Sequence, residues 1–348
     1  MKQNFFDARE QKAIDSVGST LGKLPDFCYD FFIGVESRTS ALTRKNYAVD
    51  LFIFFEYLSI RLEKPITDIS LADLNTLSAI HIEGFLSYLN YYSRGGKTRK
   101  NGEKGKARKL ATLRSFFKFF FNKDKLVSNV ASKVETPKIH QKEIIRLETD
   151  EVVSIINQAE DASGLSLRAQ AFNKRTNKRD VALLTLFLGT GIRISECVGL
   201  DIADFDFKQN AFQVTRKGGN QTVLYFSDEV ANAIKIWLDH RSAMNLPADE
   251  KAVFVSLQNK RISIRAVENL VKKYAFVVNP LKKISPHKLR STYGTNLYRE
   301  TGDIYIVADV LGHKDVNTTK KHYAAISNDM RRRVAGKVVL RNSEENNE

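Results

Sequence analysis

The sequence has little cysteine and no long apolar run, and both absences narrow what the protein can be. Only two cysteines, Cys28 and Cys197, occur among 348 residues. They are too few for a disulfide framework or a zinc cluster, and their apolar neighbourhoods are typical of buried free thiols. No segment approaches the roughly 20 apolar residues of a membrane-spanning helix. The first residues, MKQNFFDARE, show no secretory signal, so we expect a cytoplasmic protein in a reducing compartment.

Negative charge is scarce relative to positive charge. The chain has 55 lysines and arginines against 40 aspartates and glutamates, a formal net charge of +15. This excess favours a polyanionic partner, because each neutralised phosphate releases condensed counterions. Hydrophobic residues make up 43% of the sequence, so the chain is globular in composition and long enough for two domains. Nucleic acid is the expected partner, and we expect the protein to associate with the nucleoid when it is bound to DNA.

The first part of the chain is expected to form a helical domain over residues 21–136, after an N-terminal extension over 1–20. Apolar residues at spacings of three and four predict two amphipathic helices. The apolar face of the first holds Tyr47, Leu51, Phe54, Phe55 and Leu58, and that of the second Leu110, Leu113, Phe117 and Phe120.

A basic segment, RGGKTRKNGEKGKARK at residues 94–109, separates these helices. It has eight basic residues and a single acidic one, Glu103, so we expect it not to pack. It is either a solvated linker or a flexible arm that contacts DNA phosphates. In the second interpretation the DNA-binding residues are Arg94, Lys97, Arg99, Lys100, Lys104, Lys106, Arg108, Lys109 and, in the following helix, Arg114.

A linker is expected over 137–146, where proline and mixed charge break the helical period. The second domain is then expected over 147–340 and a disordered tail over 341–348. We expect a helix at 150–159, a polar insertion at 160–179, a buried helix through VALLTLFL, and helices at 285–299, 303–311 and 316–338. Residues Val267, Leu270, Val271 and Tyr274 mark a further helix.

One β-hairpin is predicted within this second domain. The segment AFQVTRKGGNQTVLYF alternates around Gly218-Gly219, a pattern typical of two strands joined by a tight turn, with Lys217 at the turn. The predicted fold class is therefore mainly α, with α+β character in the second domain and a small antiparallel β-hairpin or sheet.

Three short segments of this domain carry polar residues suited to phosphate chemistry. In LGTGIRISE, two glycines precede a helix on which Arg193 and Glu196 are three residues apart. A Walker-type nucleotide site is not indicated, because it needs a Gly-Lys-Ser/Thr ending that is missing here. In SPHKLR, Ser285 and Pro286 predict a helix start that places His287 and Arg290 in the first turn, a favourable place for an anion.

The third segment, LGHKDVNTTKKHYAAI, has His313 after a Leu-Gly turn and Tyr323 ten residues later. Taken singly, each of these residues is ordinary, and a lone tyrosine is more often a packed ring with a polar tip.

Together these segments resemble the tyrosine recombinase (phage integrase) family, and within it Xer-like and Cre-like enzymes. The resemblance rests on the TG-x-R-x-S-E box, the hairpin lysine, H-x-x-R, L-G-H and the C-terminal tyrosine, supported by TLRSFFKFF in the first domain. It implies a site-specific DNA recombinase that forms a covalent 3′-phosphotyrosyl intermediate. It also implies that residues 21–136 are the family's helical, SAM-like core-binding domain, which binds DNA, and that residues 147–340 are the catalytic domain. By this resemblance the catalytic residues are Arg193, Lys217, His287, Arg290, His313 and Tyr323, with Glu196 supporting them.

The resemblance further implies that neither a cofactor nor a metal is needed. The implied partner is double-stranded DNA with paired inverted recognition elements, bound by a homotetramer once two sites are synapsed, with a monomer allowed in the free state. Two alternatives stay open: DNA relaxation of the type IB topoisomerase kind, without synapsis, and a non-catalytic DNA-binding regulator.

Overall fold

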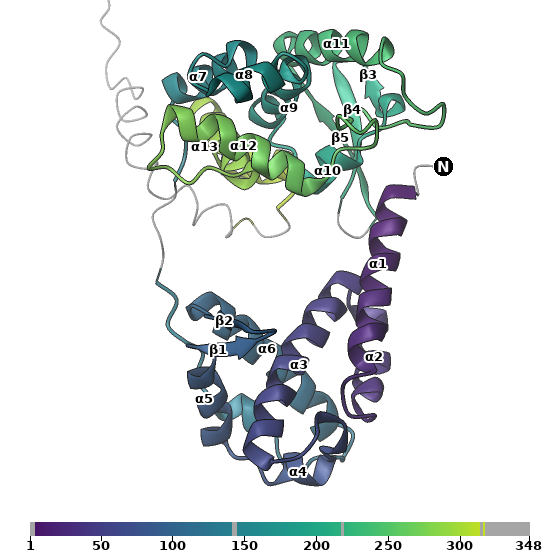
Figure 1. Cartoon of the computed structure of the whole chain (residues 1–348), viewed down its shortest axis with the longest axis vertical. Coiled ribbons are helices and arrows are strands. Elements are labelled where there is room, and N and C mark those ends of the chain that lie inside the picture. Colours follow the sequence, from purple (N-terminus) through teal and green to yellow (C-terminus); the bar gives the residue numbers. More distant parts are fainter. Residues whose placement is uncertain (1–3, 141–144, 217–218, 314–315, 317–348) are drawn as a thin grey trace, which may run out of the picture. The chain divides into compact units, whose positions relative to one another are not determined.

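Figure 1 shows the computed structural model of the chain, which describes residues 4–140, 145–216, 219–313 and 316. The chain divides into two compact units, Met1–Lys142 and Glu143–Glu348. The division falls inside the segment 137–146 that the sequence indicates as a linker. Among the described helices, none has the length and apolar character that crossing a membrane requires.

The first unit is built from helices, as the sequence predicts. They are α1 (Asn4–Leu21), α2 (Cys28–Val35), α3 (Ala41–Leu62), α4 (Leu71–Asn75), α5 (Ala79–Tyr88) and α6 (Glu103–Phe121). The predicted apolar faces of α3 and α6 are buried, with Leu51, Phe54, Leu110 and Phe117 each 0% exposed. Phenylalanine rings meet edge to face across this core, an arrangement that the aromatic quadrupole favours.

The expectation of an N-terminal extension over 1–20 differs from the structure. Residues Asn4–Leu21 form α1, which packs along α3. Ala13, Val17 and Leu21, spaced four apart, are buried in this contact. The stretch therefore belongs to the helical unit, and its four-residue apolar spacing is the signal that was available in the sequence.

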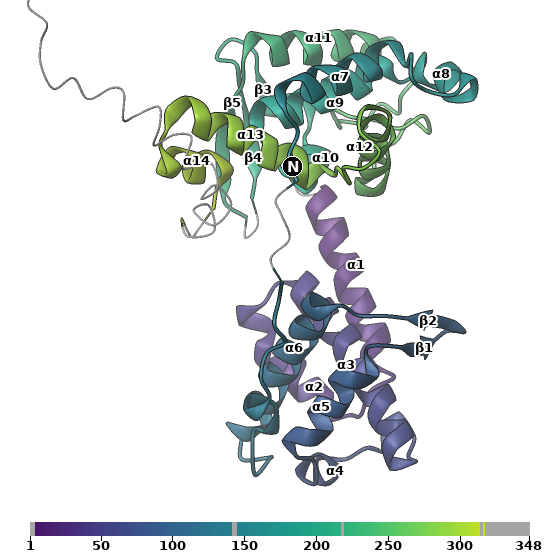
Figure 2. The same ribbon diagram turned by 90° about the vertical axis from the view of Figure 1, so that its left-hand side faces the viewer.

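The expectation that residues 94–109 cannot pack is wrong. Strands β1 (Tyr92–Arg94) and β2 (Lys97–Arg99) form an antiparallel hairpin in which Arg94 lies opposite Lys97 and Tyr92 opposite Arg99. Gly95 and Gly96 make the two-residue turn with φ of +58° and +69°, values that glycine adopts at little cost. Helix α6 then begins at Glu103. Figure 2 shows the hairpin projecting beside the helices of its unit.

The second unit combines helices with one small sheet. Its elements are α7 (Thr149–Asp161), α8 (Leu167–Asn173), α9 (Asn177–Thr190), α10 (Ile194–Gly199), β3 (Phe205–Asp206), β4 (Ala211–Thr215), β5 (Gln221–Tyr225), α11 (Asp228–Ser242), α12 (Ile264–Val278), α13 (Pro286–Thr301) and α14 (Ile304–Leu311).

The sheet confirms the predicted hairpin, because β4 and β5 pair antiparallel and β3 pairs with β4 on the other side. Helix α8 lies inside the segment 160–179 that was expected to be a polar insertion. The helix expected at 316–338 lies outside the described residues, apart from position 316.

Helix α9 is the centre of this unit. It packs against α7, α11 and α13, and its residues Leu183, Leu184, Leu186 and Phe187 are 0% exposed. The helix ends at Thr190, where Gly191 adopts a left-handed conformation with φ of +61°. This turn leads the chain directly into Arg193 and α10.

Candidate active site

Arg193 is fixed at both of its ends by one carboxylate. Its backbone N–H donates to Glu196 Oε2 at 3.0 Å, and its Nη1 donates to Glu196 Oε1 at 2.8 Å. Glu196 is 4% exposed, whereas the Arg193 side chain keeps 35% of its surface. A buried carboxylate therefore sets the direction of a guanidinium that solvent or a ligand can still reach.

The turn before Arg193 requires glycine. A Cβ on Gly191 would lie 2.4 Å from Tyr293 Cδ1 and 2.9 Å from Leu311 Cδ2. The Gly191 carbonyl accepts a hydrogen bond from Arg290 Nη1 at 2.5 Å. The same turn therefore positions Arg193, which follows it in the sequence, and Arg290, which donates a hydrogen bond to it.

Helix α13 begins as the sequence predicts, with Ser285 at the N-cap and Pro286 in the first turn. His287 is exposed on this turn, whereas Arg290 is 6% exposed. Arg290 Nη2 donates to the Leu311 carbonyl. Arg193 Nη2 donates to the same carbonyl at 3.2 Å and to the Gly312 carbonyl at 2.9 Å. Two arginines far apart in the sequence thus meet at the end of α14.

The end of α14 suits these cations. The last carbonyls of a helix have no partner within the helix and carry the negative end of its dipole. Gly312 ends α14 with φ of +59°, and the His313 backbone N–H closes the turn on the Ala308 carbonyl at 2.8 Å. His313 is half-buried immediately beyond the two guanidinium groups.

A third arginine at this helix end was missed by the sequence analysis. Arg216, the last described residue of the β4 side of the hairpin, donates from Nη2 to the Val310 carbonyl at 3.1 Å. Its Nε is buried and has no hydrogen-bond partner among the described residues. Burial lowers the pKa of Arg216, and the nearby Arg193 lowers it further. No spacing within the chain could reveal this contact, because residues 216 and 310 meet only in the folded unit.

The structure therefore brings together Arg193, Glu196, Arg290 and the Gly312–His313 turn, with His287 one helical turn before Arg290. Lys217 and Tyr323, the predicted hairpin lysine and nucleophile, lie outside the described residues.

Two of the cations predicted to bind DNA, Arg108 and Lys109, share one carboxylate partner in the first unit, Asp50. Arg108 donates two hydrogen bonds to Asp50, at 2.6 and 2.7 Å, and Thr112 donates a third at 3.0 Å. Lys109 Nζ lies 3.6 Å from Asp50 and donates to Asn101 at 2.9 Å. Burial raises the pKa of Asp50 and lowers that of Lys109, each opposed by the charge of the other. Asp50 therefore joins α3 to α6.

Arg114 is also held by the first unit itself. It donates to the carbonyls of Ala131 and Val134 and to the Thr136 hydroxyl. Its guanidinium therefore holds the segment 131–136, which follows the helices of the unit, against the side of α6. DNA contact by Arg108, Lys109 and Arg114 stays a prediction. In the structure each of them also joins elements of the first unit to one another.

Comparison with known proteins gives consistent matches. Residues 146–330 match the phage integrase family. The tyrosine recombinase XerC of Caldanaerobacter subterraneus is 33% identical over 301 residues, covering 84% of this chain and 80% of the relative. The XerC of Syntrophus aciditrophicus is 32% identical over 311 residues, covering 86% and 92%.

Solved structures share the fold at lower identity. The XerH site-specific recombinase, bound to palindromic difH substrate in a post-cleavage complex, has a TM-score of 0.65 and 18% identity over 85% of this chain and 80% of that one. The Tn1549 transposon integrase, in complex with circular intermediate DNA, has a TM-score of 0.60 and 16% identity over 88% and 98%. The family match and the two XerC relatives show that the chain belongs to the phage integrase family of tyrosine recombinases.

Proposed function

We propose that the protein is a site-specific DNA recombinase that cuts and rejoins DNA through a covalent bond to Tyr323. The observation that carries this proposal is the meeting of Arg193 and Arg290 at the Leu311 carbonyl, beside His313. Planar guanidinium groups bind phosphate oxygens with two parallel hydrogen bonds. Two of them at one place are suited to a phosphodiester and to the added charge of its pentacoordinate transition state.

Arg193 has the donors that this task needs. Three hydrogen bonds of its guanidinium go to Glu196, Leu311 and Gly312. An arginine fork has more N–H groups than these bonds use, so donors are left for a phosphate oxygen. Because the protein bonds already fix the fork, little reorganisation is needed when the substrate binds.

In the proposed first step, the Tyr323 oxygen attacks phosphorus and the bond to the 5′-oxygen breaks. A phenol has an unperturbed pKa of about 10, so its proton must be accepted during the attack. His287 is the proposed base, and its exposed place on the first turn of α13 leaves it accessible. His313 is the proposed hydrogen-bond donor to the phosphate.

The departing 5′-oxygen needs a proton, which we assign to Lys217. The 3′-phosphotyrosyl bond keeps the energy of the broken phosphodiester. The 5′-hydroxyl of another strand then attacks this bond, and Tyr323 leaves with its proton restored. Bonds broken and formed balance, so the proposed cycle calls for neither a nucleotide nor a metal.

The proposed partner is double-stranded DNA with paired inverted recognition elements, bound by four protomers when two sites are synapsed. The net charge of +15 supports a polyanionic substrate. The likeness to recombinases solved with DNA, XerH with difH and the Tn1549 integrase with its circular intermediate, supports the same class of substrate.

The test is to recover DNA that stays attached to the protein after denaturation in its host, and to sequence it. We expect the unchanged protein to carry attached DNA, and the attached fragments to share one recognition sequence. The control variant Tyr305→Phe, which changes a tyrosine that is 65% exposed on α14, should give the same result. Tyr323→Phe should abolish attachment. An adduct that survives Tyr323→Phe overturns the nucleophile, and adducts without any shared sequence overturn site specificity in favour of topoisomerase-like relaxation.

A further inference from the structure

The turn end of the β4–β5 hairpin receives little support from its own sheet. Strand β3 pairs with β4 at Phe212 and Ala211, which lie at the end of β4 far from the turn. At Thr215 and Gln221, the last pair before the turn, the described sheet is two strands wide. A two-stranded ribbon is only marginally stable by itself, so the place of this turn depends on contacts outside the sheet.

Arg216 supplies such a contact. Its backbone closes the base of the turn, because its N–H donates to the Asn220 carbonyl at 2.8 Å and its carbonyl accepts from the Gly219 N–H at 3.1 Å. Its side chain extends away from the hairpin, and Nη2 donates to the Val310 carbonyl of α14 at 3.1 Å. One residue therefore joins the base of the turn to the end of a helix.

This contact lies within the candidate active site. The Val310 carbonyl comes directly before the two carbonyls that Arg193 contacts. Burial lowers the pKa of Arg216, and the negative charge of Glu196 opposes this lowering. Glu196 is also the carboxylate that directs Arg193. The base of the hairpin and the Arg193 guanidinium are therefore fixed by the same helix end and influenced by the same carboxylate.

The position of the Arg216 side chain is constrained. Its Nε is buried and has no hydrogen-bond partner among the described residues, which is unfavourable for a charged donor. Its Nη1 occupies the space that a Cβ on Gly312 would need. An arginine beside a hairpin turn could extend its charged end into water and avoid both constraints. The observed contact therefore favours a role in the site over that of a surface charge.

We propose that Arg216 is a positioning residue that holds Lys217, the proposed general acid, at the cleavage site. The inference rests on the proposed function, and Lys217 itself lies outside the described residues. Consecutive Cα atoms are about 3.8 Å apart, so fixing Arg216 limits where the next residue can lie. The Lys217 ammonium gives a proton to the 5′-oxygen as that oxygen leaves phosphorus, and the amine regains a proton from the 5′-hydroxyl that attacks in the rejoining step.

The test measures single-turnover cleavage of the recognition sequence recovered as attached DNA. One substrate is normal DNA, and in the other the 5′ leaving oxygen is replaced by sulfur, which departs without a proton. A displacement of about 1 Å can cost about 10²-fold in rate, so we expect Arg216→Ala to be slower by about that factor on normal DNA. On the sulfur substrate it should come within about 3-fold of the unchanged protein, as Lys217→Ala should.

A double variant separates positioning from direct contact with the phosphate. If Arg216 acts through Lys217, adding Arg216→Ala to Lys217→Ala should change the rate on normal DNA by less than about 3-fold. Multiplied losses in the double variant would overturn the inference, and so would an Arg216→Ala loss that is equal on the two substrates. Both results would indicate that Arg216 contacts the phosphate itself. An unchanged rate for Arg216→Ala on normal DNA would also overturn it.

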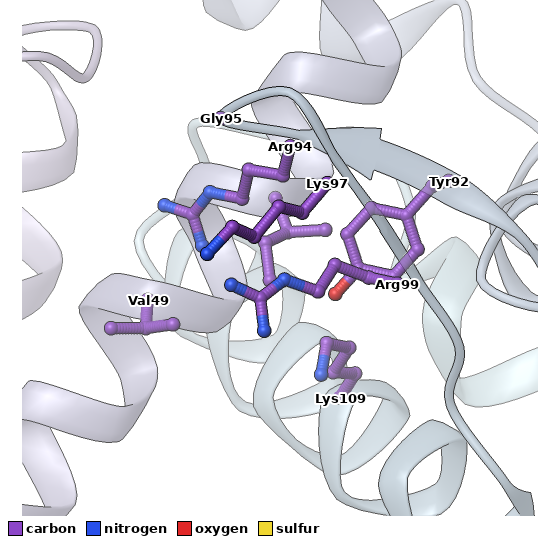
Figure 3. A pocket seen from close by; sticks show the side chains of 8 residues that line it. Val49, Tyr92, Arg94, Gly95, Lys97, Arg99 and Lys109 are labelled. Atoms are coloured by element: carbon purple, nitrogen blue, oxygen red, sulfur yellow. The ribbon is translucent and has the colours of Figure 1, made fainter.

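Arg94 provides a matched control on the other hairpin. It flanks the Gly95-Gly96 turn of β1–β2 as Arg216 flanks the turn of β4–β5, and Figure 3 shows it beside Gly95. Its ion pair with Glu56, at 3.4 Å, joins it to α3 of its own unit. Any rate change in Arg94→Ala should be equal on the two substrates, because no proposed general acid depends on this turn. Recovery of Arg94→Ala on sulfur would overturn the inference, since recovery would not then report the place of Lys217.

Further measurements separate folding and chemistry from positioning. Arg216→Met keeps the apolar stem and removes the donors, so it should show the same recovery with an unchanged melting temperature, even if Arg216→Ala folds poorly. Failure of the unchanged protein to cleave either substrate would overturn the proposed function. Failure of Lys217→Ala to recover would overturn the general acid and this inference with it. Failure of the two Arg216 variants alone to recover would overturn only the positioning role.

Discussion

The guanidinium of Arg216 fills the space that a side chain on Gly312 would need. A Cβ at position 312 would lie 1.4 Å from Arg216 Nη1, and Gly312 has φ of +59°. The glycine therefore serves two purposes. It turns the chain out of α14 towards His313, and it lets Arg216 at the β4 end reach the Val310 carbonyl, next to the carbonyls that Arg193 and Arg290 contact.

Gly312→Ala should consequently destabilise the protein by more than the cost of placing one methyl group in a left-handed conformation. A left-handed conformation costs a non-glycine residue about 1 kcal/mol, and the Arg216 guanidinium must also leave its place. Gly219→Ala, at φ of +84° with no described atom within 4 Å, should show the backbone cost alone in thermal denaturation. The stability that Gly312→Ala loses beyond Gly219→Ala should be smaller when Gly312→Ala is combined with Arg216→Ala. Strict additivity of the two changes would contradict the steric relationship.

Arg193→Ala should slow strand cleavage far more than it weakens DNA binding. Removing one donor to a charged transition state typically costs about 10²-fold to 10³-fold in rate, whereas many other cations hold the DNA. Single-turnover cleavage and anisotropy on the same DNA measure the two effects. Arg265→Ala, which removes a guanidinium that is 74% exposed on α12, should change neither by more than about 3-fold. Equal losses in cleavage and binding would show that Arg193 only binds a DNA phosphate and does not stabilise the transition state.

Lys217→Ala should cleave normal DNA poorly and recover on DNA whose 5′ leaving oxygen is replaced by sulfur. A thiolate departs without a proton, so the substrate no longer needs the general acid. Lys208→Ala removes an exposed lysine between β3 and β4 and should behave like the unchanged protein on both substrates. If Lys217→Ala does not recover on the sulfur substrate, the general acid is another group.

Much of this arrangement follows from local sequence. The helices α3, α6 and α9, the β4–β5 hairpin and the start of α13 at Ser285-Pro286 all have apolar spacing or turn residues that act within a few positions. Two arginines, Arg193 and Arg290, could be assigned because their neighbours resemble a family pattern.

The rest depends on contacts between distant positions. The β1–β2 hairpin is short and strongly charged, so its composition resembles a loop, although Gly95-Gly96 between SR and KT is a turn signal. Arg216 has no distinguishing neighbour, and its task arises only where β4 meets α14. The pairing of Arg108 with Asp50 joins positions 58 residues apart.

That buried pairing gives a prediction about stability. Asp50 is 1% exposed and compensates Arg108 and Lys109, so Asp50→Ala leaves the charge of Lys109, whose side chain is 5% exposed, without a carboxylate. The cost should be about 3–5 kcal/mol in the free energy of unfolding. Asp30→Ala breaks the Lys125 ion pair, whose two side chains are each 47% exposed, and should cost at most about 1 kcal/mol. Denaturant unfolding compares the two variants, and similar losses would show that Asp50 is not the electrostatic centre of the unit.

The last prediction concerns residues 324–340, which lie outside the described residues. Ile326, Met330, Val334 and Val338 recur every four positions beside the run of three arginines at 331–333, a pattern typical of a helix with an apolar stripe. Such a helix either packs on its own unit or docks on a neighbouring protomer, and the family resemblance favours docking. Head-to-tail docking of this kind is a heterologous contact that can close into a ring.

A chain that ends at Ala325 distinguishes these two cases. If the helix docks on a neighbour, the shortened chain should fold and bind a single half-site with unchanged affinity, because the packing of its own unit does not depend on the helix. It should lose cooperative binding to a full site and nearly all recombination, since DNA brings the protomers together and the docking energy is realised there. Gel-shift titration on half-sites and full sites measures both. Full cooperativity in the shortened chain, or weaker half-site binding together with a lower melting temperature, would assign the helix to its own unit.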